Sequence, residues 1–572
     1  MTKNLKSSFP SNVYSYLLEL DHGGVQYPHL GIFETSQDEV ITAQENARRL
    51  IFSRLPSTPC RILAIGIGLT ATMSQLIQAG YDVVTVTAAS HRIYHPKLDD
   101  SEESANIHAK LEELTTKGQF DCLVFYESAR YFDTSTLFKH ATRLLRDGGS
   151  IVIMDEVSLR IDTGYHPDLP LLENYYSQAG HLGFECTEHL DLSALAKPTI
   201  EYIIDAMARY RDQLPNDLGL DDTTVGGIFD SALLYLHKYH EGRLGYILWR
   251  CIKKSHAPKW LPDWAGPADE AELLALFRRA FGNDVSPALW RWKYQGQNPW
   301  GTLVRRGDRL VAYYGAIPRK ISMFGTEAVA VQLADVMVDP LERGILTRHG
   351  PFYLSAELYI RSYVGLGKPF PIGFGFPTQR AWRLGERLGI YGKVGQLMRI
   401  DWPALEARPS LKLCARPLKS SQRYAVDQLW LEMAGALIRE VIGVRDFNYI
   451  SHRYLEHPTI KYQVFLVSRR LTRMPFGVVV VRELDGELEL MDIVAPPERI
   501  PTLIYMVRRL TFRLGKPTVY AWITTQHTNL LSGASGTVSP TNIIIAGIDW
   551  PLPMPADIAD HWWLMSGDTD FR

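Results

Sequence analysis

Two segments of the C-terminal half, QLADVMV at residues 332–338 and ELMDIVA at residues 489–495, follow one pattern. Each is an apolar stretch with an aspartate at the same place, Asp335 or Asp492. A predicted helix, an LGKP turn and another apolar stretch follow both segments in the same order. This recurrence predicts a single α/β fold that the chain uses twice.

The two copies differ between the strand and the helix. The first copy has DPLERGILTRHG at residues 339–350, where the second has only PPERI at residues 496–500. Basic and glycine residues before a helix suit an anion, because the first N–H groups of the helix are unpaired and its dipole is positive there. We therefore expect an anion-binding loop in the first copy and none in the second.

The N-terminal part alternates strands and helices. Buried-strand patterns occur at residues 61–68 (RILAIGIG), 121–128 (DCLVFYES) and 150–157 (SIVIMDEV), with helical stretches between them. Such alternation predicts a mainly parallel sheet covered by helices on both faces. Two further strand-like stretches, at residues 183–193 and 242–254, are expected at the far edge of this sheet.

Composition indicates an ordinary globular protein of several domains. The chain has 572 residues, 46% of them apolar, and a formal net charge of -2. This length exceeds what one hydrophobic core supports. A balanced charge argues against a nucleic-acid partner, because such complexes depend on clustered lysine and arginine.

Neither a metal site nor a membrane span is expected. The five cysteines are widely separated and form no ligand pair with one another or with histidine. No apolar stretch is long enough to cross a bilayer, and the N-terminus lacks the pattern of a signal peptide. We expect a cytoplasmic protein, and the sequence leaves its oligomeric state open.

Losses of hydrophobic periodicity divide the chain into three pieces. The expected boundaries are an N-terminal domain at residues 1–254, a linker at 255–268, a second domain at 269–402, a linker at 403–422 and a third domain at 423–572. The last segment, WWLMSGDTDFR at residues 562–572, is expected to form a closing strand and an exposed tail.

The first piece resembles class I SAM-dependent methyltransferases over roughly residues 25–254. The resemblance depends on RILAIGIGLT, FDCLVFYES and LLRDGGSIVIMDEV. It implies a Rossmann-like fold and S-adenosylmethionine as a cofactor, since two glycines after the first strand allow close backbone approach. The implied cofactor-binding residues are Gly66, Gly68, Thr70, Thr87 and Glu127. Thr87 stands where the family has an acidic residue for the ribose.

The middle piece resembles acyltransferases of the GNAT superfamily, and the third piece resembles the same fold without the loop. The resemblance implies two α/β domains with mixed sheets and one site for acetyl-CoA or another acyl-CoA. The strand ADVMV would pair with the pantetheine arm, and the loop would bind the pyrophosphate. The implied CoA-binding residues are Val336, Val338, Arg343, Gly344, Arg348 and Gly350.

Attack of an amine on a thioester requires a free amine and therefore a general base. Asp335 is the first candidate because it lies on the strand beside the expected thioester, and Glu327 is the second. A structural role at a sheet bulge is the alternative for Asp335, because the loopless copy also has an aspartate there, Asp492.

The proton donor for the leaving thiolate is less clearly marked. Many relatives have a tyrosine in the helix before the LG turn, and alignment on this turn places Gly385 there. Tyr391 is the candidate acid, with Tyr353 and Tyr314 as alternatives.

Three functions are compatible with these patterns. The first is an acyl-CoA-dependent N-acyltransferase, with acetyl transfer as the simplest case, that acts on a small-molecule amine. The second is a bifunctional methyl and acyl transferase, and the third is a non-catalytic binding or assembly protein that has lost its sites. The sequence does not identify the acceptor or the length of the acyl chain.

Overall fold

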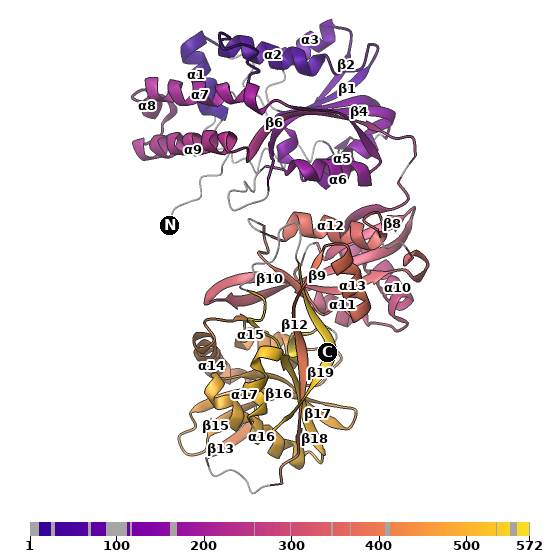
Figure 1. Ribbon diagram of the computed structural model, residues 1–572, viewed down its shortest axis with the longest axis vertical. Coiled ribbons are helices and arrows are strands. Elements are labelled where there is room, and N and C mark those ends of the chain that lie inside the picture. Colours follow the sequence, from indigo (N-terminus) through magenta and orange to yellow (C-terminus); the bar gives the residue numbers. More distant parts are fainter. Residues whose placement is uncertain are drawn as a thin grey trace. The chain divides into compact units, whose positions relative to one another are not determined.

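Two units, residues 1–261 and 262–572, make up the computed structural model (Figure 1). The structure describes residues 11–24, 29–66, 70–86, 111, 113–114, 117–160, 169–256, 258–297, 299–344, 347–365, 368–406, 412–533, 535–548 and 558–570. Each unit has its own sheet and its own hydrophobic cores.

The first unit is built on a six-stranded sheet in the order β2-β1-β3-β4-β6-β5, as counted over its described residues. Its strands are β1 (Arg61–Ile65), β2 (Asp82–Val86), β3 (Phe120–Tyr126), β4 (Leu145–Ser158), β5 (Phe184–Asp191) and β6 (Leu244–Lys253). The strands β2, β1, β3 and β4 are parallel, and β6 runs antiparallel to β4 and β5. The mainly parallel sheet is confirmed, and β5 and β6 form the expected far edge.

Helices cover both faces of this sheet (Figure 1). They are α1 (Ser11–His22), α2 (Val40–Phe52), α3 (Thr70–Gln78), α5 (Thr134–Leu144), α6 (Leu172–His181), α7 (Ser193–Arg209), α8 (Leu214–Leu218) and α9 (Asp222–His240). Alternate residues of β1 point to opposite faces, so Ile62 packs in the cluster that contains α2 residues and Leu63 in the cluster that contains α5 residues. Burial on both faces explains why these strands are apolar throughout.

The second unit has a mixed sheet of fourteen strands among the described residues. The strands of its first half are β7 (Leu261–Ala265), β8 (Gly301–Arg306), β9 (Arg309–Met323), β10 (Thr326–Val338), β11 (Gly373–Gly375) and β12 (Tyr391–Pro403). Those of its second half are β13 (Leu413–Pro417), β14 (Val441–Gly443), β15 (Gln463–Arg469), β16 (Pro475–Leu484), β17 (Glu487–Val494), β18 (Thr518–Thr524), β19 (Thr537–Ile548) and β20 (Trp562–Trp563). The helices are α10 (Glu270–Phe281), α11 (Pro287–Lys293), α12 (Pro351–Tyr363), α13 (Gln379–Arg387), α14 (Arg423–Ala436), α15 (Phe447–Ile450), α16 (Ile500–Arg513) and α17 (Thr528–Ser532).

The two halves of this unit repeat one arrangement and exchange a strand. The parallel pair β10 and β11 in the first half matches the parallel pair β17 and β18 in the second. The late strand β12 of the first half pairs with β18 of the second, and β19 of the second half pairs with β11 of the first. The predicted repeat is therefore present, and the exchange joins both halves in one sheet.

Both segments expected as linkers contribute strands. β13 lies within residues 403–422 and pairs with β15, while β7 lies within residues 255–268 and pairs with β8. Short strands of this kind are hard to recognise in proline-rich sequence because their pairing partners lie far along the chain.

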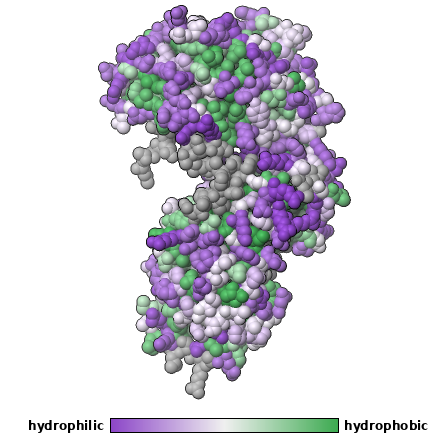
Figure 2. Space-filling view, in the orientation of Figure 1, coloured by the Kyte–Doolittle hydropathy of each residue, from purple (hydrophilic) through white to green (hydrophobic). Residues whose placement is uncertain are grey.

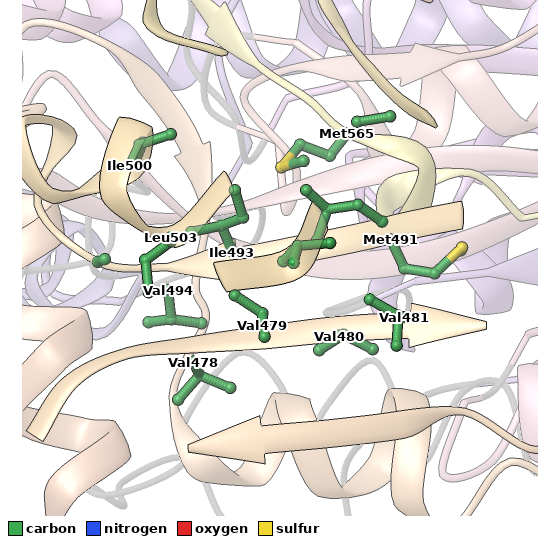
Figure 3. Packing of buried hydrophobic residues seen from close by; sticks show 14 of the residues in the cluster. Val478, Val479, Val480, Val481, Met491, Ile493, Val494, Ile500, Leu503 and Met565 are labelled. Atoms are coloured by element: carbon green, nitrogen blue, oxygen red, sulfur yellow. The ribbon is translucent and has the colours of Figure 1, made fainter. Parts of the chain in front are cut away.

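The predicted closing strand is present as β20, but the described residues after it are buried up to Thr569, so the expected exposed tail is wrong for this part. Trp562, Trp563 and Met565 are at most 1% exposed. β20 pairs with β14, and Met565 forms an isolated bridge with Ile523 of β18. Met565 packs into the core formed by β16, β17 and α16 (Figure 3).

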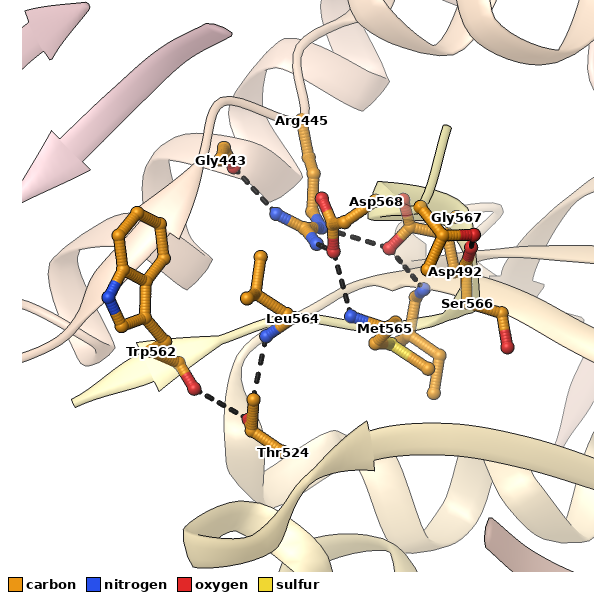
Figure 4. A network of polar contacts seen from close by, with 12 residues as sticks. Gly443, Arg445, Asp492, Thr524, Trp562, Leu564, Met565, Ser566, Gly567 and Asp568 are labelled. Atoms are coloured by element: carbon orange, nitrogen blue, oxygen red, sulfur yellow. Dashed lines mark hydrogen bonds and ion pairs between the residues drawn. The ribbon is translucent and has the colours of Figure 1, made fainter. Parts of the chain in front are cut away.

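A buried arginine binds this segment to the second half (Figure 4). The fully buried guanidinium of Arg445 lies 2.9 Å from Asp492 and 2.6 Å from Asp568. It also donates a hydrogen bond to the carbonyl oxygen of Gly443 at 2.7 Å. A charge without water depends on such partners, so each member of this network needs the others.

The visible face of both units is mostly hydrophilic, with small hydrophobic patches (Figure 2). Among the described residues no helix is long and apolar enough to cross a membrane.

Replacing Arg445 should destabilise the second unit strongly. In Arg445→Met two carboxylates lose their buried counter-charge, so we expect the free energy of unfolding to fall by about 3–5 kcal/mol. Urea unfolding of the full chain, followed by tryptophan fluorescence, measures this. Arg513→Met, at an exposed position near the end of α16, is the control and should change stability by less than about 0.5 kcal/mol. Equal stability of the two variants would contradict the network.

Candidate functional site

The parallel strands β10 and β11 separate after a short paired stretch in the first half of the second unit. They pair only from Val331 to Leu333, opposite Gly373 to Gly375. Farther along, β10 continues beside β9 to Val338, which lies opposite Ala312. Beyond Leu333, no described strand pairs with β10 on the β11 side.

A bulge in β10 decides which of its backbone groups face this gap. The register against β9 shifts between Ala334 and Met337, and the amide of Asp339 donates to the carbonyl oxygen of Val311 at 2.8 Å. Because alternate residues face opposite edges of a strand, Val336 and Val338 then face away from β9. The carbonyl oxygen of Val338 accepts a hydrogen bond from Arg343, so the pairing of both residues with a ligand backbone stays a prediction.

Asp335 lies at the bulge with φ of +49°, and both of its carboxylate oxygens have a partner. Lys293 Nζ lies 2.8 Å from Oδ1 and 2.7 Å from Oδ2, and the hydroxyl of Tyr294 donates to Oδ2 at 2.9 Å. Both donors come from the end of α11. Gly315 opposite leaves room for Tyr294, since a Cβ there would lie 2.3 Å from its hydroxyl oxygen.

The second half repeats this arrangement. Asp492 lies beside a register shift of β17 and accepts a hydrogen bond from Tyr454 at 2.8 Å, while Arg445 takes the place of the lysine. A carboxylate that joins a bulge to a helix in both halves has a structural role, which agrees with the alternative weighed for Asp335. Its role as general base stays a prediction.

Glu327 lies at the other end of β10, next to the turn that follows β9. It is exposed and is eight residues from Asp335 along an extended strand, which corresponds to about 26 Å. The structure therefore does not bring the two predicted bases together.

The loop between β10 and α12 presents two arginines. Arg343 donates to the carbonyl oxygens of Val338 at 2.9 Å and Ala280 at 2.5 Å, so it fixes the loop to the end of β10. The exposed Arg348 lies over the ring of Tyr353, 5.8 Å from its centroid.

The two loop glycines differ in position. Gly344 is exposed and has open space around it, whereas Gly350 is buried and is the N-cap of α12. Glycine has no side chain to cap the helix, and Pro351 at its first position has no N–H group.

Tyr391 fills the space that Gly385 leaves. A Cβ on Gly385 would lie 2.0 Å from Cδ2 of the Tyr391 ring. The Tyr391 hydroxyl donates to the hydroxyl of Tyr314 at 3.0 Å, and both rings are buried in one hydrophobic cluster with Tyr353. Burial raises the pKa of Tyr391 and Tyr314, so both hydroxyls keep their protons at neutral pH.

The corresponding gap in the second half is filled. β17 pairs with β18 only from Leu488 to Leu490, and the C-terminal segment lies alongside the remainder of β18. The amide of Thr524 donates to the carbonyl oxygen of Leu564 at 3.1 Å. A Cβ on Gly567 would lie 3.0 Å from the carbonyl oxygen of Met491 on β17. The predicted difference between the copies thus includes an occupied gap as well as a missing loop.

The first unit has a glycine turn at the carboxyl end of β1. Gly66 has φ of +141°, and a Cβ there would lie 2.9 Å from Cβ of Ser128. Thr70 begins α3, whereas Gly68 and Thr87 lie outside the described residues.

Glu127, predicted at the same cofactor site, bonds to protein groups. Its carboxylate accepts from the amide of Leu30 at 2.7 Å and from the Tyr246 hydroxyl at 2.9 Å. Despite burial, hydrogen bonding and charge attraction from His29 and then Arg130 lower the pKa of Glu127. Neither partner was predictable from the sequence, because residues 29–30 and 246 lie far from Glu127 along the chain.

Three charged residues were missed in the sequence: Lys293, which binds Asp335; Asp570, which lies 3.9 Å from Lys293; and Arg319. They lie in three distant segments. The one signal in the sequence is that both copies of the repeat have a basic residue followed by a tyrosine, Lys293–Tyr294 in the first and Arg453–Tyr454 in the second. Among the described residues, no group of three histidine, cysteine, aspartate or glutamate side chains could hold a metal ion.

A family model described as acetyltransferase (GNAT) domain matches residues 265–352. This span contains Asp335, β10, the loop and the start of α12. Residues 265–352 therefore match a GNAT domain, as expected for the middle piece. None of the curated proteins matches the chain.

Several solved structures are similar to parts of the chain. A GCN5-related N-acetyltransferase from Kribbella flavida is 18% identical over 50% of this chain and 70% of its own, with a TM-score of 0.39. A probable N-acyltransferase from Enterococcus faecalis V583 is 11% identical over 50% and 72%, with a TM-score of 0.40. A putative sarcosine dimethylglycine methyltransferase from Galdieria sulphuraria is 13% identical over 42% and 98%, with a TM-score of 0.35.

Gly385→Ala should displace the Tyr391 ring. Because the new Cβ would overlap this ring, we expect the free energy of unfolding to fall by about 1–3 kcal/mol. In a Tyr391→Ala background the same change should cost little, and a double-mutant cycle by urea unfolding measures the coupling. Gly435→Ala, in α14 with nothing within 4 Å of its Cβ, is the matched control. An equal cost of Gly385→Ala in both backgrounds would show that the ring is not the cause.

Proposed function

We propose that the chain is an acyl-CoA-dependent N-acyltransferase that acts on a small-molecule amine, with acetyl-CoA or another acyl-CoA as donor. The observation that carries the proposal is the gap between β10 and β11, which opens in the copy that has the basic loop and matches the GNAT family model. Both features are specific to the first half, so we propose one acyl-CoA site per chain.

In this proposal the backbone of Val336 and Val338 pairs with the pantetheine arm. The loop residues Arg343, Gly344, Arg348 and Gly350 and the first amides of α12 bind the phosphates. Unpaired amides at a helix N-terminus and nearby guanidinium groups favour an anion for the same electrostatic reason.

The proposed reaction is the transfer of the acyl group from the thioester to the amine. The amine nitrogen attacks the thioester carbonyl, the new C–N bond forms, and the C–S bond breaks to release CoA thiolate. The Tyr391 and Tyr314 pair, which holds its protons at neutral pH, is proposed to protonate this thiolate. Asp335, paired with Lys293, is proposed to accept the proton that the attacking amine nitrogen loses.

Replacing the loop arginines should weaken acyl-CoA binding. Arg348→Ala removes a charge at the proposed phosphate site, so we expect an increase in Kd of about tenfold or more. Arg343→Ala should act in the same direction because it also releases the end of β10. Isothermal titration calorimetry with acetyl-CoA measures both.

The control ligand is acetyl-pantetheine, which has the thioester and lacks the phosphates. Its affinity should be the same for Arg348→Ala and for the unmodified protein. Unchanged acetyl-CoA affinity in both arginine variants would refute the assignment of this loop.

A second candidate function is methyl transfer by the first unit. It is supported by Gly66, whose left-handed backbone lies at the carboxyl end of β1 in a parallel sheet, where such folds bind nucleotide cofactors. Gly68, Thr70 and Thr87 complete the proposed S-adenosylmethionine site. Glu127 contributes less directly, because its carboxylate bonds to Leu30 and Tyr246.

Binding of S-adenosylmethionine should raise the melting temperature of the full chain. A ligand that binds only the folded state stabilises it in proportion to the logarithm of its concentration over Kd. Differential scanning fluorimetry with S-adenosylmethionine, S-adenosylhomocysteine and, as a control, methionine tests this. No shift with either adenosyl ligand at millimolar concentration would exclude the bifunctional alternative.

A further inference from the structure

The face of the sheet opposite α12 carries a second group of polar and charged side chains, which begins where β10 is still paired with β11 and extends to Asp335. In β9 and β10, Ile317 and Ala334 pack with α10 and α11, whereas Ala316 and Leu333 pack with α12. Gln332 pairs with Ile317, so its side chain lies on the α11 face.

Arg319 lies on this same face, two residues after Ile317. Its Nε donates to Oε1 of Gln332 at 2.7 Å. The amide of Gln332 in turn donates to the carbonyl oxygen of Asp568 at 2.9 Å. The hydrogen-bond partner of the Arg319 guanidinium is therefore a neutral side chain.

The C-terminal segment connects Arg319 to the Asp335 site. Asp570, two residues beyond Asp568, lies 3.9 Å from Nζ of Lys293, which binds Asp335. Two residues span at most about 7 Å, so the arginine and the lysine flank one short stretch of chain. The site on the α11 face is thus built from both halves of the second unit.

The two cations of this site differ in their carboxylate partners. Lys293 faces two carboxylates, of which Asp335 is 8% and Asp570 is 12% exposed. Among the described residues, no acidic oxygen lies within ion-pair distance of Arg319, although its side chain is partly buried. Burial lowers the pKa of Arg319, and the attraction of Asp568 and Asp570, which lie beyond ion-pair distance, offsets this only in part.

We infer that Arg319 binds a carboxylate of the acceptor, so that the substrate is an amine that also carries a carboxylate, as amino acids do. The inference rests on the proposed acyl transfer. A guanidinium with unused donors matches a carboxylate in shape and charge. The amine of the same molecule is then directed to Asp335 and Asp570, and its nitrogen to the gap where the thioester lies.

The test compares acceptors that differ only in the carboxylate. We would measure kcat/KM with acetyl-CoA for L-amino acids and for the corresponding amines, such as phenylalanine and phenethylamine. The protein should prefer the amino acids. Arg319→Gln should lower kcat/KM for amino acids by about tenfold to a hundredfold and leave the amines within about twofold, with Arg319→Lys between.

Arg513→Gln, at an exposed position near the end of α16, is the matched control and should change neither value. The melting temperature and the acetyl-CoA affinity of each variant check that the fold and the donor site are intact. A preference for amines, or an equal loss on both acceptor classes in Arg319→Gln, would overturn the inference.

A direct binding measurement separates this inference from the proposed function. If the chain binds no acyl-CoA, the proposed acyl transfer fails, and calorimetry with N-acetylphenylalanine alone still tests the carboxylate site. Binding that Arg319→Gln weakens and Arg513→Gln leaves unchanged supports the inference. Absence of binding to the unmodified protein, or binding that does not depend on Arg319, refutes it.

Discussion

The parting of two parallel strands is the constraint on which the second unit depends. Where β10 leaves β11 and β17 leaves β18, backbone groups lose a partner, and buried backbone groups need one. The second half meets this need with its own C-terminal segment, held by Arg445. The first half pairs with no described segment at this place, which is why we assign the ligand to it.

Both halves also have an aspartate at the bulge, but the charged side chains around it differ. Asp335 and Asp492 each tie a bulged strand to the helix before it through a tyrosine hydroxyl. Their cationic partners differ. Lys293 also lies near Asp570, whereas Arg445 is buried between the carboxylates of Asp492 and Asp568. One duplicated framework thus leaves an open gap in one half and encloses a charged network in the other.

Strand exchange explains why the site needs both halves. Because β12 and β19 cross between the halves, the sheet is continuous and the C-terminal segment can reach β10. Loss of that segment would remove Asp570 and also reopen the second gap. The first unit has its own sheet, and its predicted cofactor residue Glu127 is bound by neighbouring protein groups.

The sequence by itself determined the alternation of strands and helices, the internal repeat and the loop present in one copy. These are local patterns, since periodicity and turn residues depend on neighbours along the chain. It also marked Val336, Val338 and Gly385 through their place in the repeat or in the resemblance. The structure then explained why position 385 is a glycine: the ring of Tyr391 occupies the space of a Cβ.

Only the tertiary structure decided the exchanged strands, the buried tail, and the neighbours of Arg319, Lys293 and Asp570. These contacts join segments up to about 280 positions apart, and no local pattern specifies which distant side chain meets another. The burial of a charge, and hence its need for a partner, is a property of packing. The sequence therefore identified the fold and the loop, and the folded chain decided which side chains meet at the site.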